Sequence, residues 1–353
     1  MASYSEGILL GVGNPLLDIS SEVDMEYVKK YELKMSNAIL AEEKHMPIYG
    51  ELMKNKDVKY IAGGATQNSI RVAQWMMQAK GATSYIGCVG KDDYAKKLTD
   101  CAAGDGVRVE YLEDADTPTG TCACLIVDKE RSLVANLAAA NKYKVDHMKS
   151  EKIVPIYKAA KTIYAAGFFI TVSPDTIDLL AKHCDETSST FCMNLSAPFI
   201  CQVPPFAKVL KDNLKYMDYL FGNESEAAEF AKMMKYEETD VAKIAALASK
   251  EESVKGKKRI VVFTQGSSCT CVAVEGKVTC YEVPKLDAKK IVDSNGAGDA
   301  FVGGFLSQQL AGADLATCVD AGHYAAQVVI QSSGTNLEGK PEYKPKKADI
   351  VKA

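Results

Sequence analysis

The chain has 353 residues, of which 47% are hydrophobic and 25% are charged, and its formal net charge at pH 7 is −4. This length allows one large α/β unit with an appendage, or two domains. The slightly acidic balance gives no general attraction to nucleic acid or to anionic membranes. No apolar run approaches the length of a membrane span, so we expect neither nucleic-acid nor membrane partners.

The 11 cysteines are odd in number and scattered along the chain. This pattern favours reduced thiols in a cytoplasmic protein over a disulfide scaffold, and a nuclear presence stays open. The pairs Cys122/Cys124 and Cys269/Cys271 lack a second Cys or His pair at zinc spacing. We therefore expect them to be core residues of strands. Residues 1–6 have no basic region before the first apolar run, which is a poor secretion signal.

The first predicted strand, residues 8–13, leads into Gly11-Val12-Gly13-Asn14-Pro15-Leu16. This run resembles a dinucleotide-binding fingerprint but has Leu16 where that fingerprint has Gly or Ala, and Pro15 restricts the turn. A Rossmann oxidoreductase is therefore a poor alternative. Asp18 follows, and its carboxylate is either a turn residue or a ligand for the vicinal hydroxyls of a sugar.

Residues 19–60 are rich in Lys and Glu and only weakly periodic, which predicts helices and surface in an inserted region. The run 62–69 then opens a helix. Glycines such as Gly63 and Gly64 before a helix allow a ligand to approach the backbone closely. Asn68 could offer its amide to the same ligand, although a plain loop explains this motif more often.

The next segment is expected to contain a strand over 84–90 and a helix that Asp92 caps and that runs to about residue 103. Two strands, 121–128 and 132–138, form a hairpin with its turn at Lys129-Glu130. This hairpin and residues 19–60 could form a small sheet that covers a site. Arg131 at the edge of the turn is either an ordinary surface residue or a phosphate contact on a mobile flap.

From about residue 145 helices and strands alternate, which indicates a mainly parallel sheet covered on both faces. Ligands of such sheets bind beyond the C-terminal strand ends, where Asn194, Asn223, Gly266 and Gly296 are expected. The expected helices are 146–160, 174–184, 205–214 and 314–332, and the expected strands are 162–169, 190–196, 219–222, 259–266, 269–275 and 277–283.

The run 293–301, Asp-Ser-Asn-Gly-Ala-Gly-Asp-Ala-Phe, stands at the start of an Ala/Gly-rich predicted helix. The backbone N–H groups of Gly296, Ala297 and Gly298 would point at one anionic group, with the helix dipole behind them. Asp299 in the first turn should stay ionised and accept a proton from a substrate hydroxyl. An anion cradle beside a carboxylate is what phosphoryl transfer to an alcohol requires.

Three motifs in order, Gly63-Gly64, Asn223-x-x-Glu226 and the run 293–299, resemble those of the ribokinase-like (pfkB) carbohydrate kinases. The Gly-Ala-Gly-Asp motif is shared by that whole superfamily and identifies only a kinase. Within the family the chain looks like the adenosine kinases, nearly from end to end. The segments that carry this closer resemblance are 13–18, 63–69, 119–122, 136–141, 167–169, 194–199 and 221–224.

The resemblance implies a ribokinase-like α/β fold with a mainly parallel central sheet and a small α/β lid. The large domain would comprise residues 1–17, 65–116 and 142–353, and the lid residues 18–64 and 117–141. The implied activity is transfer of the ATP γ-phosphate to the 5′-hydroxyl of adenosine, with Mg²⁺ as cofactor. We expect a monomer.

The resemblance also assigns roles to individual residues. Asp299 would be the base, the backbone of Gly296–Gly298 the anion hole, and Arg131 a phosphate contact made when the lid closes. Glu226 would order Mg²⁺ through water, with Asn223 nearby. On the nucleoside side the implied residues are Asn14, Leu16, Asp18, Gly63, Gly64, Asn68, Leu133, Ala135, Phe169 and Phe199, and on the ATP side they are Asn223, Thr264, Gly266, Asn295 and His323.

Some positions leave alternatives open. Ser294 stands where the family usually has Thr, and Ala38 where relatives often carry a longer polar side chain. Phe169 and Phe199 follow strand ends, where an aromatic is more often core, and His323 inside a helix suits packing better than chemistry. The competing functions are a sugar or other nucleoside kinase of the same superfamily and a non-catalytic nucleotide-binding module.

Overall fold

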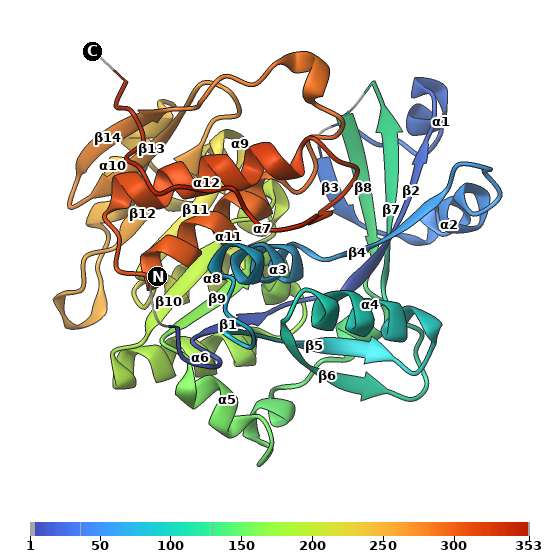
Figure 1. The fold of residues 1–353 in the computed structure, drawn as a ribbon, viewed down its shortest axis with the longest axis horizontal. Helices are drawn as coiled ribbons and strands as arrows, with labels where there is room; N and C mark the ends of the chain where they lie inside the picture. The colour runs from blue at the N-terminus through green and yellow to red at the C-terminus, as the bar shows by residue number, and fades with distance from the viewer. Residues whose placement is uncertain (1–3, 36, 129, 352–353) are drawn as a thin grey trace.

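The computed structural model describes residues 4–351 except 36 and 129, and its strands form two sheets (Figure 1). The larger sheet has nine strands in the order β14-β13-β12-β11-β10-β9-β1-β5-β6. The pairs from β6 to β12 are parallel, and β13 and β14 add an antiparallel hairpin at one edge. Their bounds are β1 Leu9–Val12, β5 Thr83–Gly90, β6 Arg108–Asp114, β9 Thr162–Ala166, β10 Thr190–Asn194, β11 Tyr219–Asn223, β12 Ile260–Thr264, β13 Cys269–Val274 and β14 Lys277–Glu282.

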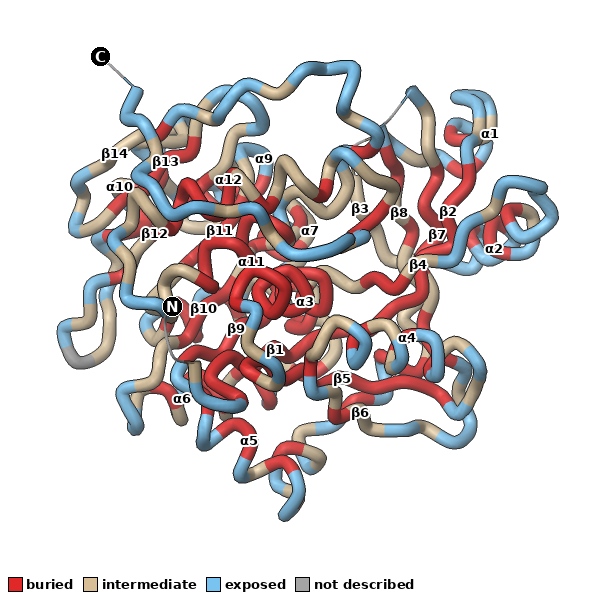
Figure 2. The backbone as a smooth tube through the Cα atoms, viewed as in Figure 1, coloured by how far each residue is buried: buried red, intermediate tan, exposed pale blue. Residues whose placement is uncertain are grey.

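Helices cover both faces of this sheet, so its central strands are apolar and buried (Figure 2). One face packs against α5 Val154–Ala159, α6 Pro174–Thr187, α7 Pro198–Gln202, α8 Pro204–Leu214, α9 Glu224–Met234 and α10 Val241–Lys250. The other face packs against α3 Ala65–Met77, α4 Asp93–Gly104, α11 Ala297–Leu310 and α12 Leu315–Val329.

The smaller sheet has the strand order β3-β8-β7-β2-β4 and stands beside the C-terminal ends of the large sheet's strands (Figure 1). It is covered on its outer side by α1 Met25–Lys30 and α2 Pro47–Leu52. Its strands are β2 Leu16–Glu22, β3 Asn37–Leu40, β4 Lys59–Gly63, β7 Thr121–Val127 and β8 Glu130–Asn136. These strands come from the two stretches assigned to the lid, apart from Leu16 and Leu17. The domain boundaries themselves stay a prediction.

Two local expectations from the sequence were wrong. The pattern of residues 19–60 predicts helix and surface, but β2 extends to Glu22, and β3 and the start of β4 also lie there. The expectation that this stretch joins the hairpin in one small sheet is confirmed. Pairing with β7 and β8, which are distant in sequence, outweighs the weak local pattern. The single helix over 146–160 is interrupted: a 3₁₀ turn, Val145–Lys149, precedes α5, which Pro155 opens.

Other expected elements agree with the structure to within a few residues. Asp92 caps α4, and its side chain accepts the N–H of Ala95 at 2.9 Å. The two hairpin strands form as β7 and β8, while Lys129 of the predicted turn lies outside the described residues. In the described part of the chain, no helix combines the length and apolarity needed to cross a membrane.

Helices α3 and α11 lie side by side and approach closely at Gly303. A Cβ atom at this position would collide with the backbone oxygen of Ser69 and with the side chain of Val72, both in α3. Only glycine therefore lets the two helices come this close, and their N-terminal ends are held at the same end of the pair.

We expect Gly303→Ala to destabilise the protein by about 1–3 kcal/mol, because the added methyl group overpacks the α3–α11 contact. Gly50→Ala is the matched control: a Cβ there meets no atom within 4 Å, and alanine favours the helix by about 0.5–1 kcal/mol. Urea unfolding of both variants measures the two changes. Equal effects of the same sign would contradict the packing argument.

Candidate active site

A cavity of about 280 Å³ lies where the C-terminal strand ends of the large sheet face the small sheet. One part of its wall is polar and contains three carboxylates, Asp18, Glu226 and Asp299. Another part is apolar. The predicted site residues that line it are Asn14, Leu16, Asp18, Gly64, Asn68, Leu133, Ala135, Phe169, Asn223, Glu226, Thr264, Asn295, Gly296, Gly298 and Asp299.

Asp299 lies in the first turn of α11 and Asn68 in the first turn of α3. The Asn68 Nδ2 donates a hydrogen bond to the Asp299 Oδ2 at 3.1 Å. Burial raises the pKa of Asp299 from 3.8 to about 7, the Asn68 hydrogen bond opposes this shift, and the charges of Asp18 and Glu226 add to it. This raised pKa departs from the expectation that Asp299 stays ionised at neutral pH, because burial disfavours the charged form.

The N-terminus of α11 is shaped for an anion. Gly296 is its N-cap with φ of 76°, a left-handed conformation that suits glycine. Gly298 faces open space, since a Cβ there would meet no atom within 4 Å. The early N–H groups of a helix have no intrahelical partners. The backbone of Gly296, Ala297 and Gly298 is therefore available to a negatively charged group beside Asp299, although Ala297 itself is not among the lining residues.

Asp18 lies within β2, not in a turn, and is 8% exposed. Its carboxylate rests against Gly63, where any Cβ would collide with it. Gly64 has φ of 96°, and a Cβ there would strike the Asn14 carbonyl. Burial raises the pKa of Asp18 to about 7, while the Arg131 charge opposes the shift. Gly63 thus allows close packing against the Asp18 carboxylate and Gly64 against the Asn14 backbone, and Gly63 itself is not among the residues that line the cavity.

Two buried side-chain oxygens on the cavity wall, Oδ1 of Asn14 and Oδ1 of Asn68, have no hydrogen-bond partner among the described residues. The amide nitrogen of Asn14 fixes this side chain, since its Nδ2 donates a hydrogen bond to the Phe168 carbonyl at 3.3 Å. Buried amide oxygens are normally satisfied. Their state here indicates a polar ligand with donors of its own.

Glu226 and Asn223 form a capping box at the start of α9. Asn223 donates to both oxygens of Glu226, from its backbone N–H at 3.0 Å and from Nδ2 at 2.8 Å, and its Oδ1 accepts the Glu226 N–H. Burial raises the pKa of Glu226 to about 7, and the Asn223 backbone opposes that shift. This pair holds a carboxylate rigidly on the cavity wall, at the end of β11.

The apolar part of the cavity comes mainly from the small sheet. Leu16 of β2 and Leu133 and Ala135 of β8 lie there, as the sequence indicated. Ile39, Leu40 and Phe168 also line the cavity, although the sequence did not indicate them. The parallel pairing of β3 with β8 places this strand over the site, which no local pattern reveals. Ala38, noted as a departure from relatives, lines the cavity as well.

The phenylalanine ring that is partly exposed at the cavity is not one of the two that were expected there. Phe169 touches the cavity, but it is completely buried and packs on Tyr143 with ring centroids 5.3 Å apart. Phe199 is not among the lining residues and lies behind Phe168, with centroids 6.0 Å apart. Phe168 keeps a partly exposed side chain at the cavity. It is therefore the better placed ring for stacking on a planar ligand.

Arg131 is buried, with 4% of its surface exposed. The expectation of a surface residue on an open flap is therefore wrong. Its Nε donates to Asp293 Oδ1 at 2.6 Å, and its Nη2 contacts Asp293 Oδ2, so the two side chains form a bidentate pair. Its Nη1 donates to the Ser20 hydroxyl at 3.1 Å. Asp293 in turn accepts the N–H groups of Asn295 and Gly334. The small sheet is thereby tied to the loop before α11.

Two residues expected on the ATP side are not among the residues that line this cavity. His323 is buried, its Nε2 is 2.9 Å from Thr270 Oγ1, and burial lowers its pKa to about 4. It belongs to the packing between α12 and β13, and not to the cavity wall. Gly266, with φ of 54°, lies in the turn after β12 and is likewise outside the lining residues.

Comparison with known proteins agrees with this arrangement. The family model described as pfkB family carbohydrate kinase matches residues 25–342. The chain belongs to the pfkB carbohydrate kinases. Its relatives place it among the adenosine kinases of that family. The expected ribokinase-like α/β fold with a small second sheet is thereby confirmed.

Among the similar proteins, adenosine kinase 1 of Arabidopsis thaliana is 52% identical over 343 residues, which cover 97% of this chain and 99% of that protein. The crystal structure of Anopheles gambiae adenosine kinase with P1,P4-di(adenosine-5) tetraphosphate has a TM-score of 0.93 and 44% identity, and covers 96% of this chain and 100% of that one. Schistosoma mansoni adenosine kinase with 2-fluoroadenosine has a TM-score of 0.93 and 35% identity, covering 97% and 100%.

We expect Asp293→Asn to lower the free energy of unfolding by about 3–5 kcal/mol, because it leaves the buried Arg131 charge uncompensated. Asp212→Asn, which breaks the exposed pair with Lys208, is the control and should cost at most about 1 kcal/mol. Urea unfolding at pH 7 measures both. Similar small losses in the two variants would show that the Arg131–Asp293 pair is not an effectively buried one.

Proposed function

We propose that this pfkB kinase transfers the γ-phosphate of ATP to the 5′-hydroxyl of adenosine, giving AMP and ADP. The observation that carries the proposal is the convergence of Asp299 and the N-terminus of α11 at the polar end of a cavity whose other end is apolar. The relatives named adenosine kinase, at up to 52% identity, support the choice of nucleoside.

Adenosine would bind with its ribose near Asp18, Gly64 and Asn68. A deeply buried carboxylate suits a pair of vicinal hydroxyls, because each hydroxyl donates to one oxygen. The unpartnered Oδ1 atoms of Asn14 and Asn68 would accept further donors of the nucleoside. The purine would occupy the apolar end, between Leu16, Leu133, Ala135, Phe168, Phe169 and the β3 residues, with Phe199 supporting Phe168 from behind.

In the proposed reaction Asp299 takes the proton of the 5′-hydroxyl as that oxygen attacks the γ-phosphorus, and ADP leaves. A base with a pKa of about 7 is well matched to reaction at neutral pH. The N–H groups of Gly296, Ala297 and Gly298 would hold the negative oxygens of the transferring phosphoryl group. Positioning and charge stabilisation supply most of the catalysis of phosphoryl transfer.

ATP would approach from the side of Asn223, Thr264 and Asn295, which line the cavity opposite the small sheet. Mg²⁺ when bound would neutralise charge on the phosphates, and Glu226 is the carboxylate that would order its water ligands. The fit rests on the donor set: Glu226 is a buried carboxylate, and hydrogen bonds from Asn223 to both of its oxygens hold it rigidly on the cavity wall. Gly266 and His323 have no direct part in this proposal.

Arg131 would contact the phosphates only after leaving Asp293, since the two are paired in this structure. We therefore propose that Arg131 contributes in a step in which it exchanges the Asp293 carboxylate for a phosphate group.

A sugar kinase is a weaker alternative, because the apolar end of the cavity offers few partners for sugar hydroxyls. A non-catalytic module needs no base such as Asp299. We expect a monomer.

We expect Asp299→Asn to reduce kcat by about 10²–10⁴-fold, because Asn cannot accept the proton of the 5′-hydroxyl. KM for adenosine should change little, since other groups hold the nucleoside. In the unaltered enzyme kcat/KM should rise with pH through about 7 as Asp299 loses its proton. Steady-state kinetics between pH 5 and 9 test this. Near-normal turnover of the variant would remove Asp299 from the role of base.

Stability provides the control for that variant. The folded pKa of Asp299 is raised above its unfolded value, so the native state binds the proton more tightly and loses stability as pH rises from about 4 to about 7. Asp299→Asn lacks this loss. The free energy of unfolding of Asp299→Asn, compared with that of the unaltered protein at the same pH, should therefore be larger at pH 8 than at pH 4. A folded variant with this pH dependence rules out misfolding as the cause of low turnover.

We expect 2′-deoxyadenosine to be a much poorer substrate than adenosine, with kcat/KM lower by about 10²-fold or more, because a buried carboxylate would lose its hydroxyl partner. In Asp18→Asn the preference should shrink, mainly through a loss of activity toward adenosine. Coupled ADP-release assays with both nucleosides measure this. Equal kcat/KM values in the unaltered enzyme would contradict the ribose role of Asp18.

A further inference from the structure

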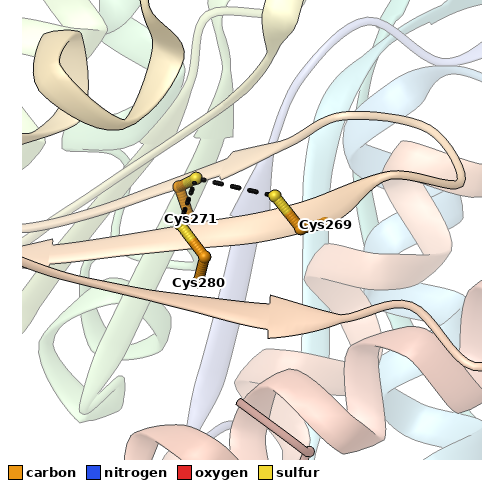
Figure 3. Close-up of side chains that lie close together, drawn as sticks. All are labelled: Cys269, Cys271 and Cys280. Carbon is orange, nitrogen blue, oxygen red and sulfur yellow. Dashed lines mark hydrogen bonds between the residues drawn. The ribbon is translucent and has the colours of Figure 1, made fainter. Parts of the chain in front are cut away.

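Three cysteine side chains gather on the antiparallel hairpin at the edge of the large sheet, outside the active-site cavity (Figure 3). Cys269 and Cys271 lie on β13, two residues apart and so on one face, and Cys280 lies on β14. Their sulfur atoms all lie within 4.8 Å of one another. The sequence predicts core positions for Cys269 and Cys271. It does not reveal the third thiol, because only the register of the hairpin brings Cys280 near them.

The register makes the cluster compact. Cys271 and Cys280 are direct partners, and their sulfur atoms are 2.9 Å apart. The carbonyl of Cys280 accepts the N–H of Val351 at 2.9 Å and so faces away from β13. Cys271 and Cys280 are therefore a non-hydrogen-bonded pair, in which the side chains come closest. The distance from Cys269 Sγ to Cys271 Sγ is 3.9 Å.

One neighbouring side chain donates hydrogen bonds to the cluster. Gln265 Nε2 donates toward Cys269 Sγ at 3.0 Å and toward Cys271 Sγ at 3.4 Å. A donor shared by two sulfur atoms stabilises negative charge on them, as outer-shell groups of metal sites do. Cys271 is buried, while Cys269 and Cys280 are partly exposed, so the cluster can be reached from one side.

We propose that Cys269, Cys271 and Cys280 form a binding site for one thiophilic d¹⁰ cation of the Cu(I) class. Three sulfur atoms around one metal at about 2.3 Å lie about 4 Å from each other. The Cys269–Cys271 distance already matches this spacing, and a small rotation of Cys280 would complete it. The group contains three ligands among the described residues, whereas a closed zinc site needs four. Soft thiolates in threefold coordination suit Cu(I).

Proton release is part of this binding. Burial raises the thiol pKa values of Cys269 and Cys271, so both are protonated at pH 7 in the metal-free protein. Each thiol that becomes a ligand gives its proton to solvent, and no electron is transferred. Affinity should therefore rise with pH.

The test is an anaerobic titration of the reduced full chain with Cu(I), in competition with a chromophoric Cu(I) chelator. We expect one tightly bound equivalent with a near-ultraviolet sulfur-to-copper band, and three sulfur neighbours by X-ray absorption. Cys271→Ser and Cys280→Ser should each abolish this equivalent. Gln265→Ala should weaken it by about 10–100-fold. Cys101→Ser, a partly exposed thiol outside the cluster, is the matched control and should bind normally.

Two results would overturn the proposal. Unchanged Cu(I) binding in Cys271→Ser and Cys280→Ser would place the metal elsewhere, with Cys122 and Cys124 as the next candidates. A Cys271–Cys280 disulfide that persists in the protein under thiol reductant, found by peptide mapping, would make the cluster a covalent cross-link instead. If the serine variants fold poorly, the Gln265→Ala affinity and the X-ray absorption of the unaltered protein still decide.

Discussion

The close contact between α3 and α11 is the constraint on which the proposed site depends. Gly303 allows the α11 backbone to lie against Ser69 of α3, and the two helices then begin at the same cavity. Asn68 and Asp299 each stand in the first turn of one helix, 231 residues apart in sequence, and meet through one hydrogen bond. Two helix N-termini directed at one space concentrate positive potential there. The polar end of the cavity is thus a product of helix packing.

That positive potential coexists with three carboxylates whose pKa values are raised to about 7. Burial is the largest cause in each, and mutual repulsion adds to the shift of Asp299. Such a group lowers stability at neutral pH, because deprotonation in a dry cavity costs free energy. Buried carboxylates of this kind suit a binding site for hydroxyl donors and cations, because both stabilise the ionised form of a desolvated carboxylate. Stability is reduced where the proposed chemistry needs a base.

The small sheet contributes in a different way. It supplies the apolar wall through β2, β3 and β8, and it is tied to the large unit by the Arg131–Asp293 pair. Asp293 also accepts two backbone N–H groups, one of them from Asn295 in the loop that leads into α11. A movement of the small sheet that broke this pair would therefore release the loop that precedes the anion-binding turn. In the proposed mechanism, the position of the small sheet and the geometry of the anion-binding turn are therefore coupled through the Asp293 carboxylate.

The α/β class, most strand and helix positions, and the motifs around Gly63, Asn223 and Asp299 could be predicted from the sequence alone. Strand alternation, glycine runs and caps are local signals that survive in one dimension. The sequence did not reveal β3 over the cavity, the broken helix at 146–160, or Phe168 as the partly exposed ring in place of the buried Phe169. Nor did it show that Arg131 is buried against Asp293, or that Cys280 joins Cys269 and Cys271. Those features come from pairing and packing between segments that are distant in the sequence. Burial and strand register are properties of the assembled fold. The tertiary structure is therefore needed to show which side chains lose water and which partners they meet.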